Sequence, residues 1–224
     1  MFTTIDNRSI PDTQARVYEI FPIPIYEVFL SDDSISKKFL QAYNTWIEFD
    51  SDYGKKSKDT YILDNLECNE LKKEILKHAT IYAKSMLSWK IDSLKFLQSW
   101  ISVKEPNQQH LSHYHPNSAI SGIYYFDDYE SDQGSLVFHR NPVICQLMNQ
   151  FSPNYDDTNS KNIVYPWSQF TIHPQKNMLI IFPSWVHHSV QLNTSSRERK
   201  SLSFNLVPFG VFGSNELTTE LKIN

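Results

Sequence analysis

The feature that most constrains the fold is a change of hydrophobic period at about Leu94. From there to about Leu206 apolar residues recur at every second position, which is typical of half-buried strands. The segments with this period are 97–105, 119–127, 134–138, 163–172, 178–182, 187–192 and 200–207. Turn-forming residues separate them, and no helical pattern intervenes. Consecutive strands without crossover helices predict an antiparallel barrel or a double-sheet jelly roll.

The part of the chain before Leu94 has a different organisation. Residues 16–30, RVYEIFPIPIYEVFL, predict two short strands around a kink at Pro22 and Pro24. Two amphipathic helices follow, one capped by Asp32 or Asp33 and one running from about Asn69 to Trp89. Their apolar stripes are Ile35, Phe39, Ala42 and Trp46 in the first helix, and Leu71, Ile75, Ala79, Tyr82 and Met86 in the second. Both helices are expected to pack on the sheet.

The length of 224 residues suits a single domain. We expect residues 1–93 to form an N-terminal strand and helical layer, and residues 94–210 to form the β core. The long polar stretch 140–162 is unusual in a compact domain, and it predicts either a lid or a disordered insertion.

Composition excludes several classes of function. The net charge is −4 and the densest basic run is RERK at 197–200, so no nucleic-acid binding is expected. No apolar run is long enough for a membrane span, and the N-terminus lacks a signal-peptide core. The two cysteines, Cys68 and Cys145, are expected to be reduced. We therefore expect a cytoplasmic protein, located in the host cytoplasm if a phage encodes it.

Histidines give the first chemical signal. His113 and His115 lie two residues apart before the strand 119–127. If that strand begins before Pro116, both imidazoles lie on the same face and can bind one metal ion. Neutral imidazole suits iron, zinc, copper or nickel. Alone, a His-x-His pair is more often two ordinary histidines of a loop or a strand.

A third imidazole follows the apolar strand 178–182 and the turn Pro183-Ser184-Trp185. His188 lies 73 residues after His115, and a barrel can bring the two segments together. The neighbouring His187 is expected to face the opposite side of the strand, so only one of this pair can be a ligand.

Arg199 and Ser201 begin the last strand of the core and share one of its faces. The planar guanidinium of arginine pairs with a carboxylate through two hydrogen bonds, and a nearby hydroxyl adds a further donor. The alternative is a basic surface turn in which the arginine is solvated.

Taken together, these segments resemble the 2-oxoglutarate/iron(II) oxygenases, and more narrowly a microbial and phage branch of them. The resemblance rests on HYHPNSAISGIYYF (113–126), GSLVF (134–138), FPSWVHHSV (182–190) and RKSLSFN (199–205), and on their order. YEIFPIPIY at 18–26 is similar as well. The resemblance implies a mainly β protein with N-terminal helices, namely a double-stranded β-helix (jelly roll) with its site in the barrel mouth.

The resemblance also implies roles for individual residues. His113 and His188 would bind iron(II), and 2-oxoglutarate would chelate the iron through its 2-oxo acid end. Its far carboxylate would pair with Arg199, helped by Ser201. Tyr124 or Tyr125 would reach the cosubstrate, and the other would pack outward. The implied activity is that of a hydroxylating dioxygenase that consumes 2-oxoglutarate and O2 and releases succinate and CO2. The resemblance does not distinguish a protein, a peptide and a small molecule as its primary substrate.

One departure from the superfamily pattern concerns the metal ligands. His115 stands where the superfamily has Asp or Glu. His115 can complete a three-histidine triad, which we favour, or lie outside the ligand set while water binds the metal. A carboxylate from elsewhere, such as Asp127 or Glu105, is the third reading. Two other functions stay open: a cupin-like three-histidine enzyme that does not use 2-oxoglutarate, and a jelly roll without catalytic activity.

Overall fold

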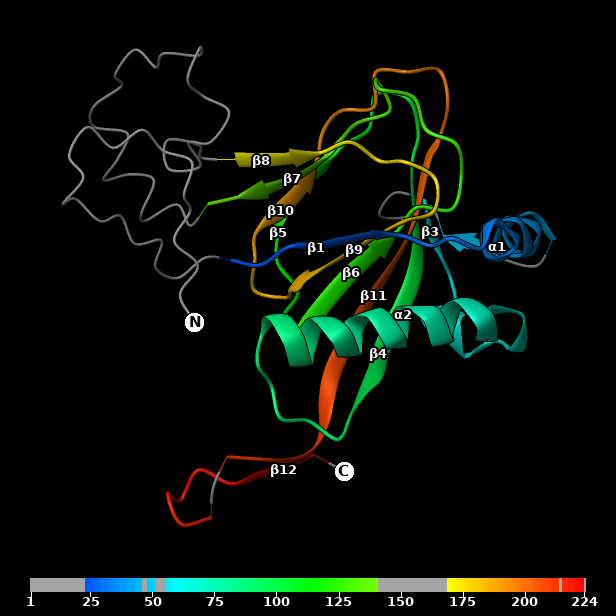
Figure 1. Ribbon diagram of the computed structural model, residues 1–224. Coiled ribbons are helices and arrows are strands. Elements are labelled where there is room, and N and C mark those ends of the chain that lie inside the picture. The colour runs from blue at the N-terminus through cyan, green and yellow to red at the C-terminus, as the bar shows by residue number, and fades with distance from the viewer. Residues whose placement is uncertain (1–22, 46–47, 51–54, 141–168, 214, 224) are drawn as a thin grey trace, which may run out of the picture.

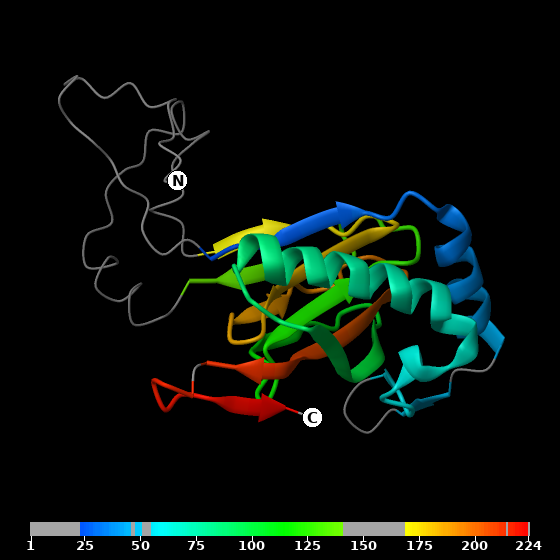
Figure 2. The same cartoon turned by 60° about the horizontal axis from the view of Figure 1, so that its bottom comes forward.

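Two antiparallel sheets that lie face to face form the core of the protein. The computed structural model describes residues 23–45, 48–50, 55–140, 169–213 and 215–223. The main sheet has the order β1-β9-β6-β11-β4-β3-β2, with β12 paired to β11, and the minor sheet has the order β5-β10-β7-β8. Helix α2 runs across the face of the main sheet that points away from the minor sheet (Figures 1 and 2). The expected jelly roll with two supporting helices is therefore confirmed.

The bounds of the elements follow the order of the chain. The main sheet comprises β1 (Tyr26–Phe29), β2 (Phe49–Asp50), β3 (Lys56–Ser57), β4 (Ser93–Lys104), β6 (Ile120–Tyr124), β9 (Met178–Pro183), β11 (Arg199–Phe212) and β12 (Leu221–Ile223). The minor sheet comprises β5 (His110–His113), β7 (Leu136–His139), β8 (Gln169–Ile172) and β10 (His188–Val190). The helices are α1 (Asp33–Thr45) and α2 (Asn69–Ile81), with short 3-10 turns at Ile62–Asp64 and Leu66–Cys68 and a π-helical turn at Tyr82–Met86.

Strand alternation divides the apolar residues between two cores. Leu179, Ile181, Leu202 and Phe204 point toward the helices and pack with Ile75 and its neighbours in what we call the helix-side core. The alternate positions point toward the minor sheet and form the inter-sheet core: Ile123, Tyr125, Leu136, Phe138, Ile172, Met178, Ile180, Phe182 and Val186. Toward β4 and β11 this inner face becomes polar, because Lys104, Arg199 and Ser201 are buried there.

The helices follow the predicted stripes, with one correction. Ile35, Phe39 and Ala42 are buried in α1. In α2 and the π-helical turn that follows it, the buried residues are Leu71, Ile75, Ala79 and Tyr82. Met86, which we expected to end the second stripe, is 52% exposed. The π-helical turn at Tyr82–Met86 changes the angular spacing of the side chains, so the four-residue repeat no longer points to the sheet. Among the described residues, no helix has the length and apolar character of a membrane span.

The strands differ from expectation mainly around the histidines. We considered a strand that begins before Pro116 and continues to residue 127, but β5 ends at His113 and β6 begins at Ile120. The last strand is longer than predicted, because β11 continues past a β-bulge at Asn205/Leu206 to Phe212. Several expectations lie outside the described residues: the first N-terminal strand piece, Trp46, Cys145, residues 163–168 and the 140–162 insertion, of which only Arg140 is described.

Candidate functional site

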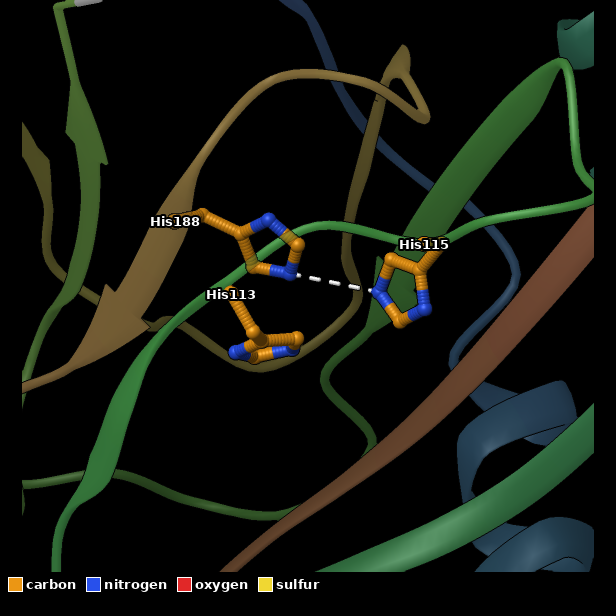
Figure 3. A group of neighbouring side chains, drawn as sticks. All are labelled: His113, His115 and His188. Atoms are coloured by element: carbon orange, nitrogen blue, oxygen red, sulfur yellow. Dashed lines mark hydrogen bonds between the residues drawn. The ribbon is translucent and has the colours of Figure 1, made fainter. Parts of the chain in front are cut away.

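Three histidines from separate segments meet inside the jelly roll. His113 ends β5, His115 lies in the connection to β6, and His188 begins β10, which pairs with β5 so that His188 lies opposite His113. One ring nitrogen of each lies within 4.8 Å of those of the other two, and the three rings converge (Figure 3). The predicted grouping of these residues is thus observed, although His115 reaches it from a turn and not from strand alternation.

Hydrogen bonds to the backbone orient two of the rings. Nδ1 of His188 lies 2.9 Å from the carbonyl oxygen of Val186, and Nδ1 of His113 lies 2.9 Å from that of Leu111. A carbonyl only accepts, so each Nδ1 carries the proton, and each Nε2 keeps its lone pair. Metal-binding histidines usually donate their other ring N–H in this way, which fixes the tautomer and the orientation of the ring.

The third ring is held through its backbone. The backbone N–H of His115 donates to the carbonyl oxygen of Ser184, at 2.9 Å, just past the end of β9. Its Nε2 lies 3.3 Å from Nε2 of His188 (Figure 3). This separation suits two ligands of one metal ion, because metal–imidazole bonds of about 2.1 Å leave the two nitrogens roughly 3 Å apart.

Burial keeps these imidazoles neutral. His188 is 3% exposed, and burial together with the neighbouring His113 lowers its pKa to about 3. Burial and the neighbouring His113 also lower the pKa of His115 to about 4, and burial lowers the pKa of His113. Neutral imidazole is the form that binds a metal ion. The donor set therefore fits a transition metal with nitrogen ligands, including iron(II).

No carboxylate joins the three histidines within the described part of the chain. Asp127 forms an ion pair with Lys200, with Oδ2 and Nζ 3.1 Å apart, and Glu105 is exposed in the turn after β4. Neither alternative source of a carboxylate ligand is therefore near the cluster in this structure.

Arg199 is buried on the inner face of β11, with 1% exposure. Its Nε donates to the carbonyl oxygen of Gly134 at 3.0 Å, and its Nη2 donates to the hydroxyl of Tyr125 at 2.8 Å. Nη1 has no hydrogen-bond acceptor among the described residues, and no described carboxylate pairs with the guanidinium. A buried cation without a counter-charge is costly, so this side chain suits a bound anion.

A second cation, Lys104, lies beside it, and no sequence motif singles it out. Lys104 ends β4 directly opposite Arg199, so both side chains point to the inner face. Lys104 is 9% exposed, and burial and the charge of Arg199 lower its pKa. It forms no ion pair with a described residue. The pairing of β4 with β11 brings Lys104 to the arginine.

The two tyrosines after the first histidine segment separate as expected. Tyr125 belongs to the inter-sheet core and contacts Arg199 through its hydroxyl and its ring. Tyr124 faces the helix-side core, where its hydroxyl lies 3.4 Å from Oδ1 of Asn177. Tyr124 therefore points away from the site, and of the two only Tyr125 remains a candidate for cosubstrate binding. Ser201 is buried on the same face as Arg199, as predicted.

The neighbours of the main candidates lie outside the site. The ring of His187 packs 5.2 Å from that of Tyr114, away from the histidine cluster. Arg197 forms an exposed ion pair with Glu130 at 2.9 Å.

Comparison with known proteins gives one family match. A family model described as "Putative 2OG-Fe(II) oxygenase" matches residues 98–205. This segment contains the three histidines, Tyr125, Lys104, Arg199 and Ser201. No curated protein sequence matches the chain.

Several solved structures share the fold at low sequence identity. The alpha-ketoglutarate-dependent epimerase SnoN from nogalamycin biosynthesis aligns with a TM-score of 0.59 and 12% identity, over 86% of this chain and 82% of its own. HygX from Streptomyces hygroscopicus, solved with nickel and 2-oxoglutarate, gives 0.58 and 9%, over 83% of both chains. A Pseudomonas putida prolyl-4-hydroxylase gives 0.53 and 12%, over 82% of this chain and 92% of its own.

The fold and the family match agree with the geometry of the site. The match covers the strands that carry the histidine cluster and the buried arginine, and the structural neighbours extend the likeness of fold to most of the chain. The part of the chain that carries the site, residues 98–205, therefore matches the 2OG-Fe(II) oxygenase family.

Proposed function

We propose that this protein is an iron(II)- and 2-oxoglutarate-dependent dioxygenase that hydroxylates a C–H bond of its primary substrate. The observation that carries the proposal is the pair of buried cations, Arg199 and Lys104, inside the same barrel as three neutral histidines. Such an interior attracts a metal ion at one end and a dianion between the metal and the cations. 2-Oxoglutarate is a dianion and can chelate the metal through its 2-oxo acid end.

Each residue of the chain then has a defined task. His113, His115 and His188 hold the metal through Nε2. Arg199 binds the far carboxylate of 2-oxoglutarate through Nη1, which has no acceptor among the described residues, with Lys104 and the hydroxyl of Ser201 beside it. Tyr125 orients the guanidinium, and the inter-sheet core behind it excludes water. Bound iron(II) and 2-oxoglutarate supply the oxidising chemistry, in which O2 provides one oxygen atom to succinate and one to the hydroxylated product.

The neighbours support this assignment at different levels. HygX was solved with 2-oxoglutarate bound, and the P. putida enzyme is a prolyl-4-hydroxylase. SnoN is an epimerase of the same cosubstrate class, so the fold serves more than one outcome. We choose hydroxylation because it needs no group beyond the metal, 2-oxoglutarate and O2.

Anaerobic calorimetry with manganese in place of iron tests the proposal. We expect 2-oxoglutarate to bind the manganese-loaded protein more tightly than glutarate, which lacks the 2-oxo group and cannot chelate the metal. Removal of the metal should lower the affinity of the protein for 2-oxoglutarate toward its affinity for glutarate. Aerobic iron-loaded protein should then form succinate from 2-oxoglutarate, even without primary substrate, at a low rate.

A second candidate is favoured by the absence of a carboxylate from the histidine cluster of the described chain. A cupin-like enzyme with three histidine ligands binds its own substrate to the metal and needs no 2-oxoglutarate. Retention of metal together with equal, weak affinities for 2-oxoglutarate and glutarate would select this candidate over the oxygenase.

A further inference from the structure

A cavity adjoins the metal site on the side of His115 that faces β4 and β11. Its volume is about 480 Å³, within the range of small-molecule sites. Trp100 and His115 form the wall next to the metal site, with ring centroids 5.7 Å apart. Asn205 forms another wall, and Tyr61 and Gln98 also line the cavity. A molecule bound here lies directly beside the histidine cluster.

Asn205 is built into this cavity with one hydrogen-bonding group free. Its side chain is 8% exposed, and its Oδ1 accepts a hydrogen bond of 2.7 Å from the hydroxyl of Ser121. Its Nδ2 donates to no described residue. Alternation along β11 places Asn205 on the inner face, because its neighbours Phe204 and Leu206 both point into the helix-side core. A buried amide without an acceptor is costly, so a ligand oxygen is its expected partner.

The same hydrogen-bond network fixes the position of His115. The hydroxyl of Ser121 lies 2.8 Å from that of Ser184, and the carbonyl oxygen of Ser184 accepts the backbone N–H of His115. Ser121 and Ser184 are both buried. Asn205 and His115 are therefore held rigidly relative to each other, which a substrate site beside a reacting centre requires.

The chemistry of the lining selects the class of ligand. No residue that lines the cavity carries a carboxylate, an ammonium or a guanidinium group. The carboxamides of Gln98, Asn117 and Asn205 both donate and accept hydrogen bonds, as the hydroxyl groups of a ligand do. The rings of Trp100 and Tyr61 offer apolar faces against which a ring can pack. The lining therefore offers a charged ligand no counter-charge.

We propose that this cavity binds the primary substrate, and that the substrate is an uncharged small molecule with a hydroxyl-bearing ring, of the glycoside type. Asn205 donates from Nδ2 to a ring oxygen or hydroxyl, and Trp100 packs against the ring face. This inference rests on the proposed oxygenase function, because it takes the histidine cluster as the reacting centre.

Ligand-observed NMR on the protein loaded with diamagnetic zinc tests the cavity without turnover. The probes are methyl β-D-glucoside and its two charged counterparts, in which carbon 6 carries a carboxylate or an amino group. We expect the neutral glycoside to bind in the millimolar range, and both charged counterparts to bind at least about tenfold more weakly. Trp100→Ala should weaken the neutral glycoside roughly tenfold.

Variants that place a charge in the cavity distinguish binding from a structural effect. Asn205→Asp keeps the acceptor for Ser121 but removes the donor, and Gln98→Glu adds a carboxylate at an exposed position of the lining. In both variants the amino glycoside should become the preferred probe. Asn69→Asp, at the start of α2 and outside this cavity, is the matched control and should change nothing.

If Asn205→Asp fails to fold, Gln98→Glu still tests the inference. Absence of neutral-glycoside binding at about 10 mM, equal binding of the three probes, or no change of preference in Gln98→Glu would overturn the inference. The same samples are titrated with 2-oxoglutarate. If 2-oxoglutarate binds while the glycoside does not, the cavity assignment fails and the oxygenase proposal stands. If the glycoside binds while 2-oxoglutarate does not, the oxygenase proposal fails and the glycoside site stands.

Discussion

At the scale of single residues, the charges of the site explain its expected ligands. Three neutral histidines leave a divalent metal with its full charge, and Arg199 and Lys104 add two buried positive charges nearby. A site with a carboxylate ligand would carry one positive charge less. Dianionic 2-oxoglutarate offsets half of this excess, so metal and cosubstrate are expected to bind cooperatively.

Replacing Arg199 by alanine removes the cation that Nη1 offers to the cosubstrate. Loss of one partner from a buried charge pair typically costs on the order of 2–5 kcal/mol. We therefore expect 2-oxoglutarate to bind at least about 30-fold more weakly, with little change in manganese affinity. Anaerobic calorimetry measures both. Arg197→Ala is the matched control, because its ion pair with Glu130 is exposed. An unchanged affinity for 2-oxoglutarate in Arg199→Ala would remove the main support for this cosubstrate.

The adjacent histidines at the start of β10 provide a second matched pair. His188→Ala removes one of three converging nitrogens and should sharply lower metal occupancy. His187→Ala should leave it unchanged, because that ring packs beside Tyr114 outside the cluster. Metal content after dialysis against limiting manganese measures the difference. The ligand assignment is wrong if the two variants behave in the opposite way.

His115 decides whether the metal has a third protein ligand. His115→Ala should weaken metal binding, because the remaining pair of imidazoles holds the ion with one bond fewer. His115→Asp should retain the metal, because two histidines and one carboxylate form the common iron(II) triad. Metal titration of both variants gives the answer. Wild-type affinity in His115→Ala would place this ring outside the ligand set.

At the scale of elements, a local sequence pattern predicted the right proximity of two residues from the wrong secondary structure. The i, i+2 spacing of His113 and His115 predicted their proximity through strand alternation. In the structure β5 ends at His113, and a turn carries His115 toward β6, where Ser184 holds its backbone. Alternation within β11 did predict that Arg199 and Ser201 share a face. Turn geometry depends on contacts with distant segments, and a single local pattern does not contain them.

The second helix shows the same limit, and it gives a test of packing. Ile75 is fully buried under the main sheet, so Ile75→Ala should reduce the free energy of unfolding by about 2–5 kcal/mol. Met86 belongs to the same sequence stripe, but the π-helical turn exposes it. Met86→Ala should therefore change stability by less than about 0.5 kcal/mol. Urea unfolding of both variants measures the contrast, and equal losses would contradict the described end of the helix.

At the scale of the whole molecule, the sequence predicted the architecture and the grouping of His113, His115 and His188. Period-two strands without crossover helices predicted an antiparallel barrel or a jelly roll, and the family resemblance narrowed this to the jelly roll. Lys104 and Asn205 were not predicted as site residues, because neither has a distinctive neighbour in sequence. The pairing of β4 with β11 brings Lys104 beside Arg199, and the pairing of β11 with β6 brings Asn205 opposite Ser121. Long-range register is a property of the assembled sheet.

The buried histidines also link the stability of the whole metal-free protein to pH. The pKa of His188 lies at about 3 and that of His115 at about 4, below their ordinary value of 6.5, chiefly because of burial. Between pH 6.5 and about 4 the unfolded chain therefore binds protons that the folded protein does not. Stability is full above pH 6.5 and is lost progressively as the pH falls.

For one histidine that stays neutral in the folded state, the loss between pH 7 and pH 5 amounts to at most about 2 kcal/mol. The carboxyl group of Asp33, whose pKa is lowered to about 2 by its hydrogen bond with Lys37, titrates below this window and does not contribute. Urea unfolding of metal-free protein at both pH values measures the loss. His188→Gln should show a smaller difference, since glutamine does not titrate. Equal stability of the wild type at pH 5 and pH 7 would mean that these imidazoles are not held neutral, and that a metal ion would then have to displace protons to bind.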